Sequence, residues 1–224
     1  MNRTLSRLIQ SSFIGIAFLL CLQTSAASQS ASSSINTNAA TQNAEDQYKL
    51  GGAYYRGEGV KQSYEQAGFW WRKAADQGNH KAMHNLGLLF LDGNGTPRNE
   101  VEGYRWIKMS ADAGDPLSQF LIGTLLIQGR GVSKNTNEGI AWIKKSADAG
   151  NANALAKLGQ DYYFGDDGLP KDLSKAVPLI KSAAEKGNPW ACQTLGLLYL
   201  RGDGVPKDDD ESSKWLTKSH QHGN

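Results

Sequence analysis

Residues 191–205 read ACQTLGLLYLRGDGV, and this stretch contains the two features that decide the fold. The Leu195-Gly196 step is followed, seven residues after the leucine, by the pair Gly202 and Gly204. The same step recurs about every 36 residues, at Leu50-Gly51, Leu86-Gly87, Ile122-Gly123 and Leu158-Gly159. Each step has its own glycine pair, lengthened by one residue in the fourth copy. A fixed period of this length is typical of a solenoid built from small stacked units.

Each repeat divides into two predicted helices. In the first helix, apolar residues recur at helical spacing, as in Leu195 and Tyr199, and the glycine pair ends it because glycine adopts positive φ readily. The second helix begins after a preferred N-cap residue, and the five caps are Ser63, Asn99, Asn135, Asp172 and Asp208. Its end is marked by Gly78, Gly114, Gly150, Gly187 and Gly223. The pattern predicts an all-α solenoid of five helix-turn-helix repeats, at 44–79, 80–115, 116–151, 152–188 and 189–224.

The glycine after each Leu or Ile is predicted to be a packing residue. A glycine inside a helix costs about 1 kcal/mol relative to alanine, so its recurrence in all five copies needs a compensating cause. We expect each of these glycines on the flank of the first helix, where a missing side chain lets the second helix approach closely.

The first 43 residues differ in composition from the repeats. Arg3 and Arg7 precede an apolar run at 13–22, and small residues follow it. This is the layout of a secretory signal peptide, predicted over 1–27 with cleavage after Ala27. The apolar run is shorter than the roughly 20 residues that span a bilayer, and an uncleaved anchor is the alternative. Residues 28–43 are uncharged and rich in Ser, Ala and Asn, which predicts a disordered leader and a secreted or periplasmic protein.

Charge and cysteine content narrow the choice of partners. Loss of Arg3 and Arg7 with the signal lowers Lys+Arg from 24 to 22, against 22 Asp+Glu. Without a net charge or a basic run, neither nucleic acid nor stable membrane insertion is expected after cleavage.

Cys21 would leave with the signal, so Cys192 alone cannot form an intramolecular disulfide, and the fold must be stable without one.

The repeats resemble the Sel-one-like repeat (SLR) family, which is related to the tetratricopeptide repeats. Residues 191–205 match its first motif, Ala-x-x-x-Leu-Gly-x-x-Tyr/Phe-x-x-Gly-x-Gly-Val, and residues 70–78 match its second, Trp-x-x-Lys-Ala/Ser-Ala-x-x-Gly. Departures are Thr96 and Leu169 at the turn valine, Leu179 at the tryptophan, and the stretched turn at Asp166-Asp167. The resemblance implies a right-handed α/α superhelix whose concave face is lined mainly by the first helices.

The resemblance also implies a function. Members of the family are adaptors and scaffolds, often secreted or periplasmic, which predicts an extracytoplasmic protein–protein interaction module acting as adaptor, regulator or inhibitor. Some members are immunity proteins against secreted lipase toxins, and this is one alternative. A cysteine-rich branch is linked to penicillin binding and β-lactamase activity, so a secreted hydrolase is a second alternative. This chain lacks the paired cysteines of that branch.

Catalytic patterns are not found in the sequence. It has no Gly-x-Ser-x-Gly, no His-Glu-x-x-His, no phosphate loop and no Ser-x-x-Lys in a catalytic context. His80 and His84 would share a helix face as a metal pair does, but no further Cys or His lies nearby in the sequence. We therefore expect no enzyme, no metal site and no cofactor.

Candidate contact residues for a protein or peptide partner come from two sets. One set lies two residues before or five residues after the repeat's Leu/Ile. Equivalent residues of the five repeats form a column, and in related folds these two columns point into the concave groove. Packing between repeats is the alternative, especially for the column five residues after. The second set has a large aromatic side chain where most other repeats have a polar or small one. Such a side chain is either an exposed binding anchor or a residue that fills a local gap in the packing. Together they are Tyr48, Tyr55, Phe69, His84, Phe120, Tyr163 and Trp190.

Overall fold

A computed structural model describes residues 43–222, and within that range all regular structure is helical. The helices are α2 (Ala44–Arg56), α3 (Tyr64–Asp76), α4 (His80–Asp92), α5 (Glu100–Asp112), α6 (Pro116–Gln128), α7 (Thr136–Asp148), α8 (Ala152–Phe164), α9 (Leu173–Glu185), α10 (Pro189–Arg201) and α11 (Asp209–His222). They confirm the predicted all-α solenoid of helix-turn-helix repeats. The predicted signal peptide, 1–27, and the predicted leader, apart from Asn43, lie outside the described residues.

The helix boundaries follow from local capping. All five predicted N-caps of the second helices accept a backbone hydrogen bond through their side chains, from Gln66, Glu102, Glu138, Lys175 and Glu211. The first helices end as expected on glycine in the left-handed region, as at Gly57 with φ of 74°. Short helices of this kind are marginal alone, so the packing between them must supply most of their stability.

The glycine after each Leu or Ile is a close-packing position, as predicted. A Cβ atom built on Gly123 would lie 2.6 Å from the carbonyl oxygen of Gly139 and 2.6 Å from Cγ1 of Ile143. In the first repeat, a Cβ on Gly51 would lie 2.4 Å from Cδ1 of Trp71. Real Cβ atoms do not come this close, so any side chain at these positions would push the two helices of the repeat apart.

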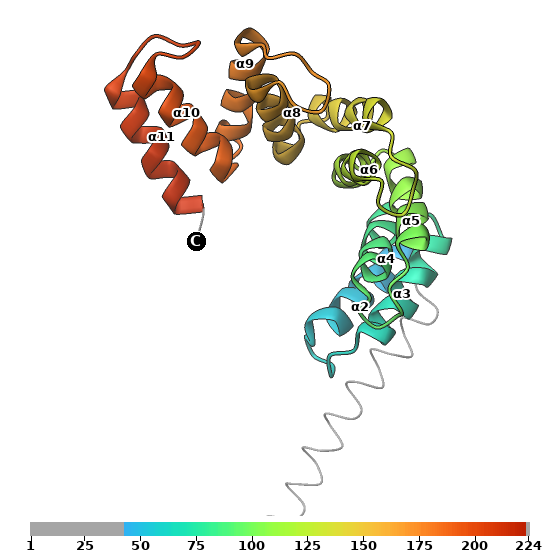
Figure 1. The fold of residues 1–224 in the computed structure, drawn as a ribbon. Helices are drawn as coiled ribbons and strands as arrows, with labels where there is room; N and C mark the ends of the chain where they lie inside the picture. The colour runs from blue at the N-terminus through green and yellow to red at the C-terminus, as the bar shows by residue number, and fades with distance from the viewer. Residues whose placement is uncertain (1–42, 223–224) are drawn as a thin grey trace, which may run out of the picture.

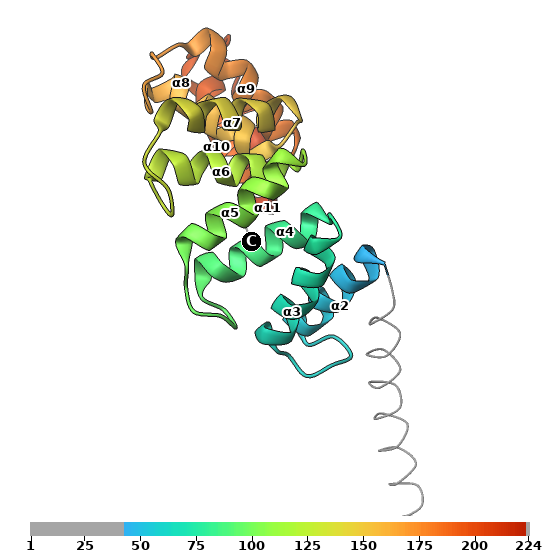
Figure 2. The ribbon, with the colours of Figure 1, turned by 90° about the vertical axis from the view of Figure 1, so that its right-hand side faces the viewer.

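The helix pairs stack in chain order into a curved array. Each helix packs against the one before it and the one after it along the chain. The first helices of the repeats lie on the inner side of the arc and the second helices on its outer side, with α2 and α11 at the two ends (Figure 1). Turned by 90°, the stack shows successive helix pairs offset from one another (Figure 2). The inner face therefore belongs to α2, α4, α6, α8 and α10.

Apolar clusters run through the stack without a disulfide between described residues. One cluster joins the first two repeats around Trp71 and Leu86, a second joins repeats 2 and 3 around Ile107 and Ile122, and the largest extends to Trp215. Cys192 is a free thiol buried in the last cluster. Between residues 43 and 222, no helix combines the length and hydrophobicity needed to cross a bilayer.

Candidate functional site

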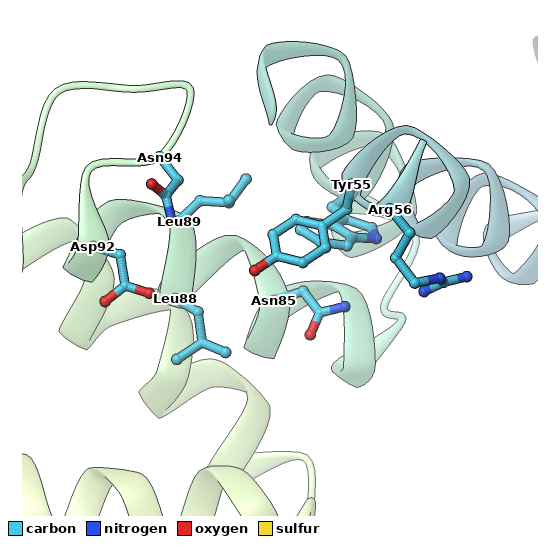
Figure 3. A pocket seen from close by; sticks show the side chains of 8 residues that line it. Tyr55, Arg56, Asn85, Leu88, Leu89, Asp92 and Asn94 are labelled. Atoms are coloured by element: carbon cyan, nitrogen blue, oxygen red, sulfur yellow. The ribbon is translucent and has the colours of Figure 1, made fainter. Parts of the chain in front are cut away.

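A pocket of about 300 Å³ lies at the junction of the first two repeats (Figure 3). Its walls come mainly from α2 and α4, the inner helices of those repeats, with one residue from α3 and one from the turn after α4. We call it the inter-repeat pocket; its lining residues are Tyr55, Arg56, Trp71, Asn85, Leu88, Leu89, Asp92 and Asn94. Of the candidate contact residues, Tyr55 is the one that lines it.

Tyr55 is held by an aromatic cluster but is not covered by it. Its ring centroid lies 5.4 Å from that of Trp71 and 5.2 Å from that of Tyr64. Trp71 is buried, and its indole N–H donates to the carbonyl oxygen of Tyr48 at 3.1 Å. Tyr55 itself keeps 38% of its surface exposed. A fixed aromatic ring with a free face suits recognition, because little side-chain entropy is lost when it binds.

The polar lining residues differ in how they are paired. Arg56 forms a bidentate salt bridge with Glu58. Its Nε and Nη2 atoms lie 2.7 and 2.8 Å from the two carboxylate oxygens of Glu58. The hydrogen bond from Arg56 lowers the pKa of Glu58 and raises that of Arg56. The side chains of Asn85, Asp92 and Asn94, in contrast, make no hydrogen bond or ion pair with any residue of the described range. The pocket therefore offers unpaired polar groups next to an aromatic face.

Tyr55 is more exposed than the equivalent residues of repeats 2 and 3. In repeats 2 and 3 the equivalent residues, Leu91 and Ile127, turn toward a glycine of the outer helix; a Cβ on Gly103 would lie 2.7 Å from Cγ of Leu91. Repeat 1 has Ala67 in place of that glycine, and Tyr55 stays partly exposed. Ser212 in repeat 5 likewise accompanies Leu200, which is 45% exposed. In repeats 1 and 5 the loss of the glycine is thus accompanied by an exposed residue on the inner face, whereas repeat 4, with Ala176, keeps Tyr163 partly buried.

The remaining aromatic candidates are placed variously. Tyr48 packs against the cluster of the first two repeats, while Phe120, Tyr163 and Trp190 pack against the C-terminal cluster, all partly buried. Phe69 lies on α3, an outer helix, where it is 49% exposed and meets Trp70 edge-on at 5.2 Å. The structure does not bring these residues into the inter-repeat pocket, and they remain separate candidates for contact.

His84 belongs to a hydrogen-bond chain that joins repeats 2 and 3. Its Nδ1 lies 2.7 Å from Oγ of Ser118, Ser118 Oγ donates to Ser110 Oγ at 2.7 Å, and Ser110 Oγ donates to the carbonyl oxygen of His80 at 2.8 Å. Each hydroxyl has one proton, and the chain ends on a carbonyl that only accepts. Both serine protons are therefore used, and Nδ1 of His84 must donate to Ser118.

Asp115 completes this network. Its Oδ2 accepts from the backbone N–H of Ser118 at 2.7 Å and lies 3.9 Å from Nδ1 of His84. Burial lowers the pKa of His84, and the opposing field of Asp115 does not cancel that effect. Neither Ser118 nor Asp115 was selected from the sequence, although both differ from the residues at the equivalent positions of other repeats. The position of Asp115 is asparagine in the other four repeats, at Asn43, Asn79, Asn151 and Asn188. The position of Ser118 is alanine in repeats 2, 4 and 5, at Ala82, Ala154 and Ala191.

A second buried polar cluster lies in repeat 4. Lys157 Nζ lies 2.5 Å from Oδ1 of Asp161 and 2.5 Å from Oδ2 of Asp167. Asp161 is fully buried at a position where repeats 2, 3 and 5 have leucine, and burial raises its pKa. Asp167 comes from the stretched turn, so the extra residue supplies the second carboxylate. Within residues 43–222, no group of three or more His, Cys, Asp or Glu is arranged to hold a metal ion.

The stacked helix pairs define the molecule as a tandem helical-repeat protein, an α/α solenoid. The Sel1 repeat family model matches residues 44–79, 80–115, 116–151, 152–188 and 191–224, and the chain therefore belongs to the Sel1 repeat family. Proteins built on this repeat generally serve as non-catalytic modules for protein–protein interaction.

Solved structures agree with this assignment. A Sel1 repeat protein from Oxalobacter formigenes is 35% identical, with a TM-score of 0.73 over 81% of this chain and 72% of that one. The protective antigen c5321 of uropathogenic Escherichia coli is 30% identical, with the same TM-score over 81% of this chain, which spans only 38% of the antigen. The immunity protein Pa5087 of Pseudomonas aeruginosa, at 21% identity, a TM-score of 0.57 and coverage of 80% and 66%, shares the fold alone. Comparison with curated protein sequences gives no match.

Proposed function

We propose that this chain is an extracytoplasmic, non-enzymatic binding protein that holds a protein or peptide on its concave face. The inter-repeat pocket carries the proposal. It combines an exposed, preorganised Tyr55 with side chains at Asn85, Asp92 and Asn94 that have no partner within the described residues. Aromatic anchors and unpaired polar groups in a concave surface are the features by which repeat proteins bind extended segments of a partner.

Affinity capture from an envelope fraction tests this function. The purified protein is used as bait beside two variants, Tyr55→Ala on the inner face and Val101→Ala on the outer helix α5, where Val101 is 60% exposed. We expect a partner that the wild type and Val101→Ala retain and Tyr55→Ala loses, with the same helical circular dichroism for all three proteins. A partner that Tyr55→Ala retains in full and Val101→Ala loses would contradict the concave-face assignment.

The extracytoplasmic location is proposed from the signal-like segment at 1–27 and is tested separately. We expect the mature protein, recovered from cells by fractionation, to begin at Ser28 and to be found in the periplasm or the medium. Recovery of the full-length chain from the cytosol would overturn this part of the proposal while leaving the binding surface untouched.

Inhibition of a secreted toxin is a special case of the same proposal. Two solved immunity proteins of Pseudomonas aeruginosa share the fold at 20–21% identity, which supports the architecture and not the target. Capture of a lipase through Tyr55 would identify this case. The hydrolase alternative is tested with a chromogenic β-lactam: we expect no sustained turnover by the purified protein, and turnover would contradict a purely binding role.

A further inference from the structure

We propose that the inter-repeat pocket receives a lysine side chain of the partner and holds its ammonium group at Asp92. This inference rests on the proposed binding function and names the chemistry of the bound segment. It is carried by the charge balance of the pocket, by the hydrogen-bond acceptors around it, and by its apolar walls.

The charge balance of the pocket is negative. Arg56 is the cation among the lining residues, and its charge is neutralised by the two-pronged pair with Glu58. Figure 3 shows Arg56 extending away from Asp92, with Tyr55 between them. Asp92, at the C-terminal end of α4, has no ion pair within residues 43–222. A cation entering the pocket would therefore meet one uncompensated carboxylate.

The acceptors suit an ammonium group in number and kind. A lysine ammonium has three N–H donors and no acceptor. Asp92 and the side-chain oxygens of Asn85 and Asn94 are acceptors that no residue of the described range uses. In Figure 3 the hydroxyl of Tyr55 is directed toward the side of the pocket where Leu88 and Asn85 lie. Asp92 and Asn94 lie at the same end of α4, so their oxygens can share the N–H donors of one ammonium. Asn85 lies two turns earlier, about 10 Å away along the helix, and with the hydroxyl of Tyr55 it lines the other side of the pocket.

The apolar walls suit the rest of a lysine side chain. Leu88 and Leu89 line the pocket with the ring of Tyr55, so a four-carbon stem can lie along them while its charged end reaches Asp92. The exposed face of Tyr55 also attracts a cation through its ring electrons. An acidic side chain would be rejected by Asp92, which gives the pocket a basis for choosing its partner.

A displayed library of random peptides, selected on the purified protein, tests this proposal. We expect the bound clones to share a lysine at one fixed position. A selected peptide is then synthesised with lysine, norleucine or glutamate at that position, and its affinity is measured by calorimetry. Norleucine keeps the stem and removes the charge, and we expect it to weaken binding roughly three- to tenfold.

Two protein variants assign the effect to Asp92. Asp92→Asn should weaken the lysine peptide, by a smaller factor than norleucine does because the contact of the ammonium with the ring of Tyr55 remains. It should leave the norleucine peptide unchanged, because the pair is already broken. Asp76→Asn is the matched control: Asp76 is the last residue of outer helix α3, is exposed and has no ion pair with a described residue. It should change neither affinity.

The outcomes separate the two proposals. Selected peptides that share no lysine but depend on Tyr55 would overturn the ammonium site and support the concave-face function. Equal losses for both peptides on Asp92→Asn would also overturn the ammonium site. Lysine peptides that bind independently of both Tyr55 and Asp92 would contradict both.

Discussion

The Nδ1 atom of His84 lies 2.7 Å from the Oγ atom of Ser118, so a hydrogen bond joins the inner helices of repeats 2 and 3. Ser118 is completely buried, and its hydroxyl is also bonded to Ser110 on the intervening outer helix. Three helices therefore meet at one polar centre inside the stack. A buried network of this kind fixes the angle between neighbouring repeats only while every member has its partner.

Ser118→Ala tests the contribution of this network to stability. The variant has the residue found at this position in repeats 2, 4 and 5, but it leaves His84 and Ser110 without their shared partner. We expect a loss of about 1 to 3 kcal/mol in the free energy of unfolding, measured by urea denaturation. The double variant His84→Phe/Ser118→Ala, which has the phenylalanine of repeat 3 at the histidine position, should recover part of that loss. A single variant as stable as the wild type would show that the network contributes nothing.

Acidification should weaken the same joint. Burial lowers the pKa of His84 below its ordinary value of 6.5, so the unfolded chain binds this proton more readily than the folded one. The stabilising contribution is therefore fully present above about pH 6.5 and is lost as the pH falls toward the lowered pKa. Unfolding measured at pH 7.5 and pH 5 should show a larger loss for the wild type than for His84→Phe. Equal losses would contradict a neutral, buried His84.

Lys157→Met should destabilise repeat 4. It removes the cation that lies between Asp161 and Asp167 and leaves a fully buried carboxylate without its partner. Removal of one member of a buried pair typically costs 3–5 kcal/mol; we expect about 2 to 4 because the Lys157 side chain is 27% exposed. The double variant Lys157→Met/Asp161→Leu, with the leucine found at this position in repeats 2, 3 and 5, should regain most of the stability. Thermal unfolding of both proteins checks this, and a double variant no more stable than the single one would show that the unpaired carboxylate is not what destabilises the Lys157→Met variant.

Two helical glycines should respond differently to alanine. Gly123→Ala places a Cβ atom against backbone of α7, and we expect a loss of roughly 1 to 3 kcal/mol. Gly68→Ala places its Cβ atom near one methyl group of Leu89, at 3.2 Å, so it should be neutral or stabilising by up to about 1 kcal/mol. Denaturation midpoints of the two variants compare these effects directly. A tolerated Gly123→Ala would refute the close-packing role.

The repeat signals in the sequence predict the fold because they act locally. Ser63 and Asn99 accept the expected N-cap hydrogen bonds, and the mid-helix glycines lie where the outer helix approaches. The candidate site was less predictable. Tyr55 could be chosen from its position in the repeat, but its exposure could not, because the equivalent residue is buried at Leu91 and exposed at Leu200.

The other members of the site depend on contacts between repeats. Asn85 and Asp92 join Tyr55 only because α4 stacks beside α2, and no local pattern marks them. The partners of His84 are equally remote in the sequence, since Ser118 lies 34 residues away. Asp115 and Ser118 differ from the equivalent residues of other repeats, and the sequence shows this. That both contact His84 or its partners could be seen only in the three-dimensional structure.

Hydrogen–deuterium exchange with the captured partner tests whether binding takes place on the inner face at the junction of the first two repeats. We predict that the partner increases protection at 48–56 and 85–94, the parts of α2 and α4 around the inter-repeat pocket, and leaves 101–109 on outer helix α5 unchanged. Protection confined to the outer helices, with 48–56 and 85–94 exchanging as in the free protein, would contradict it.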